Sequence, residues 1–211
     1  MRLHLFAGDS VTDCGRTFFD PEVAAGHLGD GWVRVVAALL GHRDPEHHRV
    51  LNAGVSGDRV GDLAVRWERD VERFAPQTLT VLIGVNDALL APPTAVDAFA
   101  DRYAEILGRV PPSVDRLVIA EPFVLPVDDR ARALREVTRP LLEVVRSAAA
   151  AAGAVLLPLD RLFEEACRQA APAWWAPDGV HPSAAGHGLI ADAWLRAVAE
   201  GPGAATRAAR A

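Results

Sequence analysis

The chain has 211 residues, of which half are hydrophobic and 24% are charged, and its formal net charge is −6. This size and composition are typical of one globular domain, which we expect over residues 1–200, with 201–211 as a flexible tail; two small domains are the alternative. The acidic charge argues against nucleic acid as a partner, and no apolar run is long enough to predict a membrane span.

Short apolar runs alternate with longer amphipathic segments along the chain. We predict strands at Leu3–Ala7, Val50–Ala53, Leu79–Ile83, Leu117–Ala120 and Ala154–Leu157. Apolar residues at helical spacing predict helices at Trp32–Leu40, Asp58–Phe74, Thr94–Leu107 (with Thr94 as N-cap), Asp128–Ala152, Arg161–Gln169 and Ser183–Val198. Residues 11–30 and 171–182 are predicted loops, and Pro140 should kink or split its helix. The pattern predicts a three-layer α/β/α sandwich, flavodoxin-like, around a parallel sheet of about five strands.

The cysteine content and the N-terminal sequence indicate in which cellular compartment the protein is expected. Cys14 and Cys167 are too few for a disulfide framework, and we expect two free thiols, with a single bridge as the alternative. No cysteine–histidine cluster has zinc-ligand spacing, so we expect no metal and no cofactor. The chain enters a motif at Gly8, which leaves no room for a signal peptide, and we expect a cytoplasmic protein unless the true start lies upstream.

Several polar residues follow predicted strands at the edge where parallel sheets bind ligands. Ser10 follows the first strand, and a serine hydroxyl needs an adjacent base to act as a nucleophile. His181 is the candidate base. Asp178 precedes it by three residues, close enough to accept from its Nδ1–H and fix the tautomer.

An acyl-transfer site also needs donors for the oxyanion of its intermediate. We expect three of them, the backbone N–H groups of Ser10 and Gly54 and the side-chain amide of Asn86. Glycine at position 54 would let the substrate approach closely.

Four blocks of the sequence resemble the signature blocks of the GDSL/SGNH hydrolases, in the order of that family. The blocks are Gly8-Asp9-Ser10-Val11-Thr12-Asp13, Asn52-Ala53-Gly54-Val55-Ser56-Gly57, Gly84-Val85-Asn86-Asp87 and Asp178-Gly179-Val180-His181-Pro182. The resemblance implies that Ser10 is the nucleophile and that Asp178 and His181 complete the catalytic set. It also implies that Ser10, Gly54 and Asn86 form the oxyanion hole and that no metal takes part.

Further segments resemble the bacterial intracellular acetylxylan esterases. They are Asp13-Cys14-Gly15-Arg16, Arg66-Trp67-Glu68-Arg69-Asp70, Glu121-Pro122-Phe123 and the Trp-Ala-Pro-Asp-Gly-Val-His-Pro stretch. The resemblance implies a serine esterase that removes short acyl groups, acetyl above all, from carbohydrates such as xylo-oligosaccharides. Some members form homo-oligomers, so a homo-oligomer is also implied. Where such enzymes carry Val-Trp-Arg, this chain has Ala88-Leu89-Leu90, without the aromatic ring and the cation.

Two other functions fit the same residues. A lysophospholipase or thioesterase would act on longer acyl chains, and a non-catalytic protein on this fold would only bind, since fold does not fix function. In each case we expect a small molecule as the ligand, and in the enzymes it is an ester.

Other residues are candidates with a structural alternative. As substrate-binding residues we consider Asp13, Arg59, Leu89, Trp174 and Trp175. Asp13 could instead hold a loop, Arg59 could be solvated, and the tryptophans could pack in the core or in a subunit interface. We expect structural or solvated roles for Ser56, His187, Cys14 and the polar-loop histidines His42, His47 and His48.

Overall fold

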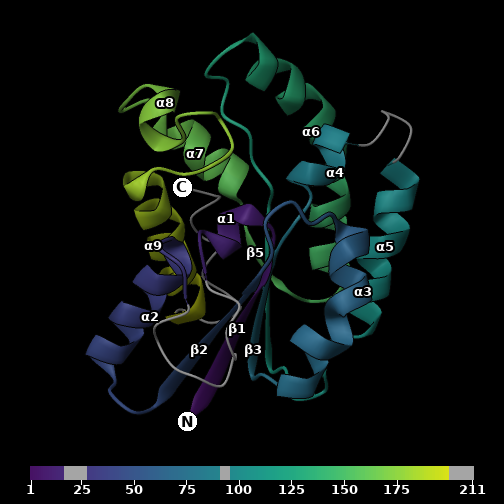
Figure 1. The fold of residues 1–211 in the computed structure, drawn as a ribbon, viewed down its shortest axis with the longest axis vertical. Coiled ribbons are helices and arrows are strands. Elements are labelled where there is room, and N and C mark those ends of the chain that lie inside the picture. The colour runs from purple at the N-terminus through teal and green to yellow at the C-terminus, as the bar shows by residue number, and fades with distance from the viewer. Residues whose placement is uncertain (17–27, 91–95, 200–211) are drawn as a thin grey trace.

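The computed structural model describes residues 1–16, 28–90 and 96–199, and Figure 1 shows helices on both sides of a central sheet. The expected N-cap at Thr94 and the expected tail at 201–211 lie outside the described residues.

The sheet is parallel throughout and has five strands in the order β2-β1-β3-β4-β5. The strands are β1 (Arg2–Gly8), β2 (His48–Gly54), β3 (Thr78–Leu82), β4 (Arg116–Ala120) and β5 (Val155–Leu157). Each overlaps a predicted strand, so the predicted fold class is confirmed. Gly8 pairs in register with Gly54 on one side and with Leu82 on the other, which brings three strand ends to one edge.

Helices cover the two faces of the sheet. One face carries α2 (Trp32–Arg43) and α9 (Ala184–Ala199), and the other carries α3 (Val60–Asp70), α5 (Val96–Gly108) and α6 (Asp129–Ala151). The shorter elements are α1 (Ser10–Asp13), η2 (Glu72–Phe74), α4 (Val85–Leu90), α7 (Leu159–Ala166) and α8 (Pro172–Trp175).

Alternation along the strands divides the core into two clusters, because successive side chains of a strand point to opposite faces. In β1, Phe6 packs with Trp32 of α2 and Trp194 of α9, whereas Leu5 and Ala7 belong to the cluster under α3, α5 and α6. Both faces are therefore buried, which explains why the strands are nearly continuous apolar runs.

Three short helices, α1, α4 and α8, were not predicted, because helices of four to six residues are too short to show a period. Asp9 starts α1 by accepting from the Val11 N–H at 3.0 Å, and Pro172 stands at the first position of α8. Pro140 does not split α6, which continues through it as one helix. The predicted helix at Asp58–Phe74 is shorter, since it ends at Asp70 and a separate turn, η2, follows.

Candidate active site

Ser10 stands at the carboxyl edge of the sheet as the first residue of α1, directly after β1 and Asp9. Asp9 is buried at the N-cap of this helix, and burial raises the pKa of its carboxyl to about 7. The cap fixes the turn after β1 and thereby the position of the serine that follows it. The N–H of Ser10, at the first position of a helix, has no intrahelical acceptor and is available to a ligand.

Ser10, His181 and Asp178 form a continuous hydrogen-bonded chain. Ser10 Oγ lies 2.9 Å from His181 Nε2, and His181 Nδ1 lies 2.7 Å from Asp178 Oδ2. A carboxylate beside Nδ1 favours the tautomer with a proton on Nδ1, which leaves Nε2 free to accept from the serine. The side chains of Asp178 and His181 are more than half exposed, so this pair faces the solvent.

The loop that carries this pair is tightly constrained. Asp178 Oδ1 accepts from the backbone N–H of Val180 at 2.9 Å and of His181 at 2.7 Å. Burial raises the pKa of Asp178, but these bonds and the one to the His181 ring outweigh it and hold the pKa below its ordinary value. Gly179 has φ +85°, and a Cβ there would lie 2.5 Å from the Leu125 carbonyl oxygen, so the turn requires glycine.

Two of the expected oxyanion donors already donate within the chain. Asn86 Nδ2 donates to the Asp58 carbonyl at 2.9 Å, and since an amide nitrogen carries two hydrogens, one remains. The Gly54 N–H donates to Asn52 Oδ1 at 2.9 Å. Its hydrogen is therefore available to a ligand only if the bond to Asn52 is shared or released.

Gly54 is required for a reason other than the expected substrate approach. A Cβ on Gly54 would lie 2.3 Å from the backbone nitrogen of Asp13 and 2.7 Å from the carbonyl carbon of Thr12. The α1 turn therefore packs directly on the end of β2, and the glycine lets the serine-bearing turn sit there.

Asn52 and Asp87 also hold the site, and the sequence analysis did not single them out. Asn52 is buried and its Nδ2 donates to the carbonyls of Thr12 at 2.7 Å and Leu28 at 2.8 Å. Asp87 accepts from the Val60 N–H at 3.1 Å, and burial raises its pKa to about 6. A polar residue in an apolar strand, as Asn52 is in β2, was the available signal.

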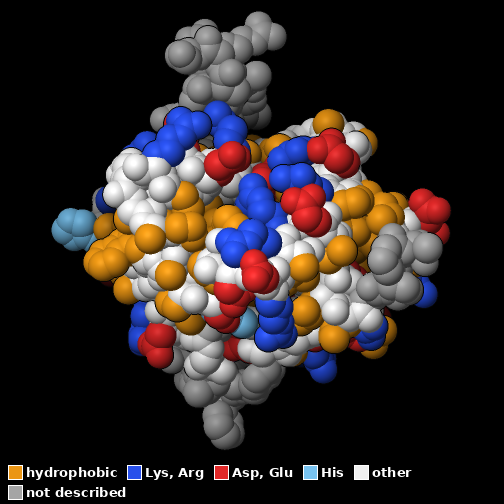
Figure 2. Space-filling view, turned by 90° about the horizontal axis from the view of Figure 1, so that it is seen from above, with side chains coloured by type: hydrophobic (Ala, Val, Ile, Leu, Met, Phe, Trp, Pro, Cys, Tyr) orange, Lys and Arg blue, Asp and Glu red, His pale blue; other side chains and the backbone are white. Residues whose placement is uncertain are grey.

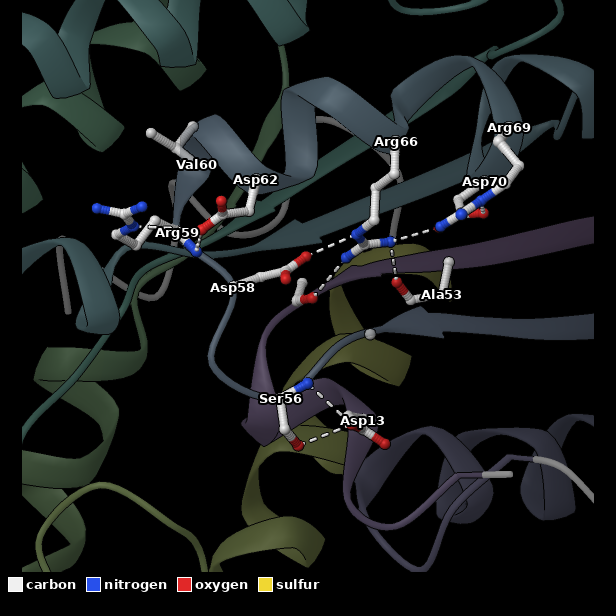
Figure 3. A network of polar contacts seen from close by, with 12 residues as sticks. Asp13, Ala53, Ser56, Asp58, Arg59, Val60, Asp62, Arg66, Arg69 and Asp70 are labelled. Carbon is white, nitrogen blue, oxygen red and sulfur yellow. Dashed lines mark hydrogen bonds and ion pairs between the residues drawn. The ribbon is translucent and has the colours of Figure 1, made fainter. Parts of the chain in front are cut away.

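Asp13 faces the protein itself. Its Oδ2 accepts from Ser56 N at 2.9 Å and from Ser56 Oγ at 2.7 Å (Figure 3). Its Oδ1 accepts from Arg16 N at 3.1 Å. The side chain is buried, with 5% exposure for the residue. These partners favour the alternative reading of Asp13 as a loop-holding residue, and they give Ser56 its role in the same turn.

The other expected substrate-binding residues differ in exposure. Leu89 on α4 and Trp174 on α8 are exposed, whereas Trp175 is half-buried and donates from Nε1 to the Ala166 carbonyl at 3.2 Å. Arg59 is half-exposed, and its Nε lies 3.2 Å from Asp62 Oδ2. Figure 2 shows the face above the sheet, where arginine and acidic side chains form a mixed band between hydrophobic areas.

The other histidines that the sequence analysis weighed lie outside the serine chain. His187 accepts from the Trp32 N–H at its Nδ1, at 3.2 Å, and its Nε2 lies 3.4 Å from Cys14 Sγ. Burial, with the nearby His181, lowers the pKa of His187 to about 4, so the ring is a neutral link between α9 and α2. The three histidines expected in one polar loop are divided among elements: exposed His42 belongs to α2, His47 pairs with Asp44 at 2.8 Å, and His48 is the first residue of β2.

Among residues 1–16, 28–90 and 96–199, no group of three or more histidine, cysteine or acidic side chains could hold a metal ion. None of the helices in these ranges has the length and hydrophobicity to cross a bilayer.

The fold and the serine–histidine–aspartate chain together define an α/β hydrolase of the SGNH type, and comparison with protein families agrees. Residues 6–189 match the GDSL-like Lipase/Acylhydrolase family, and the chain belongs to that family. It is therefore a carboxylic ester hydrolase.

Named relatives are acetylxylan esterases and similar enzymes. The chain is 32% identical over 203 residues to an acetylxylan esterase of Geobacillus stearothermophilus, with 92% of each chain covered. The crystal structure of that esterase, Axe2, superposes with a TM-score of 0.84 over 93% of this chain and 94% of its own. An α/β hydrolase from the metagenome of Lake Arreo, Spain, is 30% identical with the same TM-score and coverage. Axe2 structures with a serine, an aspartate or a histidine replaced by alanine are described as catalytic mutants.

Proposed function

We propose that this chain is a serine esterase that hydrolyses short-chain esters, chiefly acetyl esters of carbohydrates such as acetylated xylo-oligosaccharides, through an acyl-enzyme. The proposal is supported by the series of hydrogen bonds from Ser10 Oγ through His181 to Asp178, with contacts of 2.9 and 2.7 Å. In Axe2 the aspartate and the histidine whose replacement gives catalytic mutants are three positions apart, as Asp178 and His181 are.

In the acylation step, Ser10 Oγ attacks the ester carbonyl carbon while its proton moves to His181 Nε2. Asp178 keeps the proton on Nδ1 and stabilises the imidazolium that forms. The tetrahedral intermediate collapses when His181 gives the proton to the leaving alkoxide, which departs as the alcohol. Water then attacks the acyl-enzyme while His181 takes its proton, and the second tetrahedral intermediate collapses when His181 returns that proton to Ser10 Oγ and the carboxylic acid is released.

The oxyanion of each intermediate lies at the edge where β1, β2 and β3 end. The Ser10 N–H and the second hydrogen of Asn86 Nδ2 donate to it. The Gly54 N–H is the third donor and shares its hydrogen between Asn52 Oδ1 and the oxyanion, as three-centre bonds commonly do. Losing one donor of this kind typically lowers turnover about 10²–10³-fold.

The carbohydrate part of the proposal is supported by the named relatives, and one local feature favours a second candidate. Leu89 and Leu90 are exposed on α4, three and four residues after Asn86, so they share its helix face. They offer exposed apolar surface on the helix that carries Asn86, which favours a lysophospholipase or thioesterase.

Chain-length profiling distinguishes the two candidates. We expect the wild type to hydrolyse p-nitrophenyl acetate and acetylated xylo-oligosaccharides, with rates that fall as the acyl chain lengthens. A maximum at eight carbons or more would overturn the acetyl proposal.

Ser10→Ala should lose at least about 10³-fold in kcat and should not react with a fluorophosphonate, while Ser147→Ala, on α6, serves as the matched control. Undiminished hydrolysis by Ser10→Ala would overturn the mechanism.

A double variant tests the role of the α4 face. Leu89→Trp with Leu90→Arg supplies the aromatic ring and the cation that this chain lacks. We expect kcat/KM on acetylated xylo-oligosaccharides to rise about tenfold relative to p-nitrophenyl acetate, because an aromatic ring adds a large contact area for a sugar. An unchanged ratio would contradict a role for this face in sugar binding.

The proposal also covers the cellular compartment and the oligomeric state of the enzyme. Cys14 and Cys167 are both free, which supports a reducing compartment and hence a cytoplasmic enzyme, to be tested by cell fractionation. A homo-oligomer is proposed from the related esterases and is tested by light scattering coupled to size-exclusion chromatography.

A further inference from the structure

Arg66 is an arginine buried inside the carboxyl edge of the sheet, with 8% of its surface exposed. It comes from α3 and points toward the ends of β1 and β2 (Figure 3). Its Nε donates to Asp58 Oδ2 at 2.6 Å and its Nη1 to Asp70 Oδ2 at 3.0 Å. The same guanidinium also reaches two backbone carbonyls of neighbouring strands, so its position is fixed on all sides.

The first carbonyl belongs to the peptide that supplies an expected oxyanion donor. Arg66 Nη1 donates to the Ala53 carbonyl at 2.7 Å, and the N–H of that same peptide unit is the Gly54 N–H. A bond to the carbonyl fixes the plane of the peptide and therefore the direction of the N–H. It also polarises the peptide, because a cation at the oxygen makes the N–H a stronger donor.

A second connection runs through Asp58 to Asn86. The Asp58 side chain is held by Arg66, and the Asp58 carbonyl accepts from Asn86 Nδ2 at 2.9 Å. That bond uses one hydrogen of the amide and so orients the other. The guanidinium therefore helps to orient the Asn86 amide indirectly, because it holds Asp58, to which Asn86 donates.

The third connection leads to the nucleophile. Arg66 Nη2 donates to the Gly8 carbonyl at 3.0 Å, and the Val55 N–H donates to the same oxygen at 2.9 Å. Gly8 is the last residue of β1, two positions before Ser10. The bond thus ties the strand end that carries the serine to the strand end that carries Gly54.

The two acidic partners of Arg66 differ: burial raises the pKa of Asp58 above its ordinary value despite the hydrogen bond from Arg66, whereas the pKa of Asp70 is lowered. Burial raises the pKa of Asp70, but hydrogen bonds from Arg69 and Arg66 outweigh it and lower the pKa below its ordinary value. A buried guanidinium with two carboxylates loses hydration, so a purely apolar replacement of the set could stabilise the fold equally well. Fold stability alone therefore does not account for a guanidinium that is connected to the Gly54 N–H, to the Asn86 amide and to the strand end before Ser10.

We propose that Arg66 is a positioning residue that aligns the oxyanion donors of Gly54 and Asn86 with Ser10. This inference rests on the proposed esterase function. It assigns to a residue outside the serine–histidine–aspartate chain a specific part in lowering the barrier to the tetrahedral intermediate. It acts through the Ala53–Gly54 peptide and through Asp58, and it does not contact the substrate.

The test uses Arg66→Lys, which keeps the charge but loses the planar fork that reaches several acceptors at once. Arg109→Lys is the matched control, since Arg109 donates to the Ala64 carbonyl at 3.1 Å and to Glu72 at 3.0 Å, in α3 and η2. We expect Arg66→Lys to lower kcat on p-nitrophenyl acetate about 10²-fold with KM within about threefold, an unchanged pH profile and a cooperative melting transition. Arg109→Lys should keep kcat.

If Arg66→Lys does not fold, the charge-balanced variant Arg66→Met, Asp58→Asn, Asp70→Asn avoids unpaired buried charge and is measured in the same way. A folded variant of either kind with kcat within threefold of the wild type would overturn the positioning role. A loss confined to KM would overturn it as well. A wild type without Ser10-dependent hydrolysis would instead overturn the proposed function and this inference with it, so the two failures are distinct.

Discussion

Asp178 holds His181 by two different groups at once. One carboxylate oxygen accepts from the backbone N–H of His181 and the other lies 2.7 Å from the ring nitrogen Nδ1. The backbone bond sets the position of the residue, and the ring bond sets the tautomer and the rotation of the imidazole. The two functions can therefore be separated by a substitution that keeps one bond and loses the other.

Asp178→Asn makes this separation. The amide oxygen can still accept from the backbone N–H groups, but the amide nitrogen then faces Nδ1 and favours the tautomer with the proton on Nε2. Because that tautomer cannot take the serine proton, we expect kcat to fall about 10³–10⁴-fold with little change in melting temperature. Asp192→Asn, in an exposed ion pair on α9, is the control. Activity within tenfold of the wild type would contradict the tautomer argument.

Asn86→Ala removes the side-chain oxyanion donor. We expect kcat to fall about 10²–10³-fold while KM changes little, because the donor acts on charge that develops only in the transition state. Gln77→Ala is a matched control, since this amide bonds to Leu3 and Ala75 at the other end of the sheet. A large rise in KM at constant kcat would show that Asn86 binds the ground state instead.

Ser56→Ala separates loop support from substrate binding. The serine hydroxyl donates to the Asp13 carboxylate at 2.7 Å, and a hydrogen bond to a charged group contributes about 1.5–3 kcal/mol. We expect the free energy of unfolding to fall by about 1–2 kcal/mol, with KM for acetyl esters within twofold of the wild type. Urea denaturation and steady-state kinetics measure the two quantities. A tenfold rise in KM at constant stability would instead place Asp13 and Ser56 against the substrate.

His187→Asn tests the pH dependence of stability. The folded protein holds this histidine neutral with a pKa of about 4, whereas the unfolded chain takes up a proton below about 6.5. The unfolded state therefore binds more protons between these values, and the free energy of unfolding falls as the pH drops from 6.5 to 4, by up to about 3 kcal/mol for this group. Urea midpoints from pH 7 to pH 4.5 should decline less steeply in the variant. Equal slopes would contradict the prediction.

Much of the architecture followed from the sequence, because apolar periodicity is a local property. The five strands could be predicted within a few residues, and so could most helices. Pro140 was expected to kink or split its helix, and it does not split α6. The short helices α1, α4 and α8 escaped detection, since a helix of four to six residues is too short to show a period.

The sequence by itself determined the family, and it predicted the serine and the aspartate–histidine pair, because these lie in short motifs with fixed spacing. Only the tertiary structure gave the 2.9 Å contact between Ser10 Oγ and His181 Nε2, and only it showed that a Cβ on Gly54 would collide with the turn bearing that serine. It alone placed Arg66 on the carbonyls of two strand ends. The physical reason is that periodicity and spacing are local, whereas the partner of a buried polar group depends on which distant segments the fold brings together.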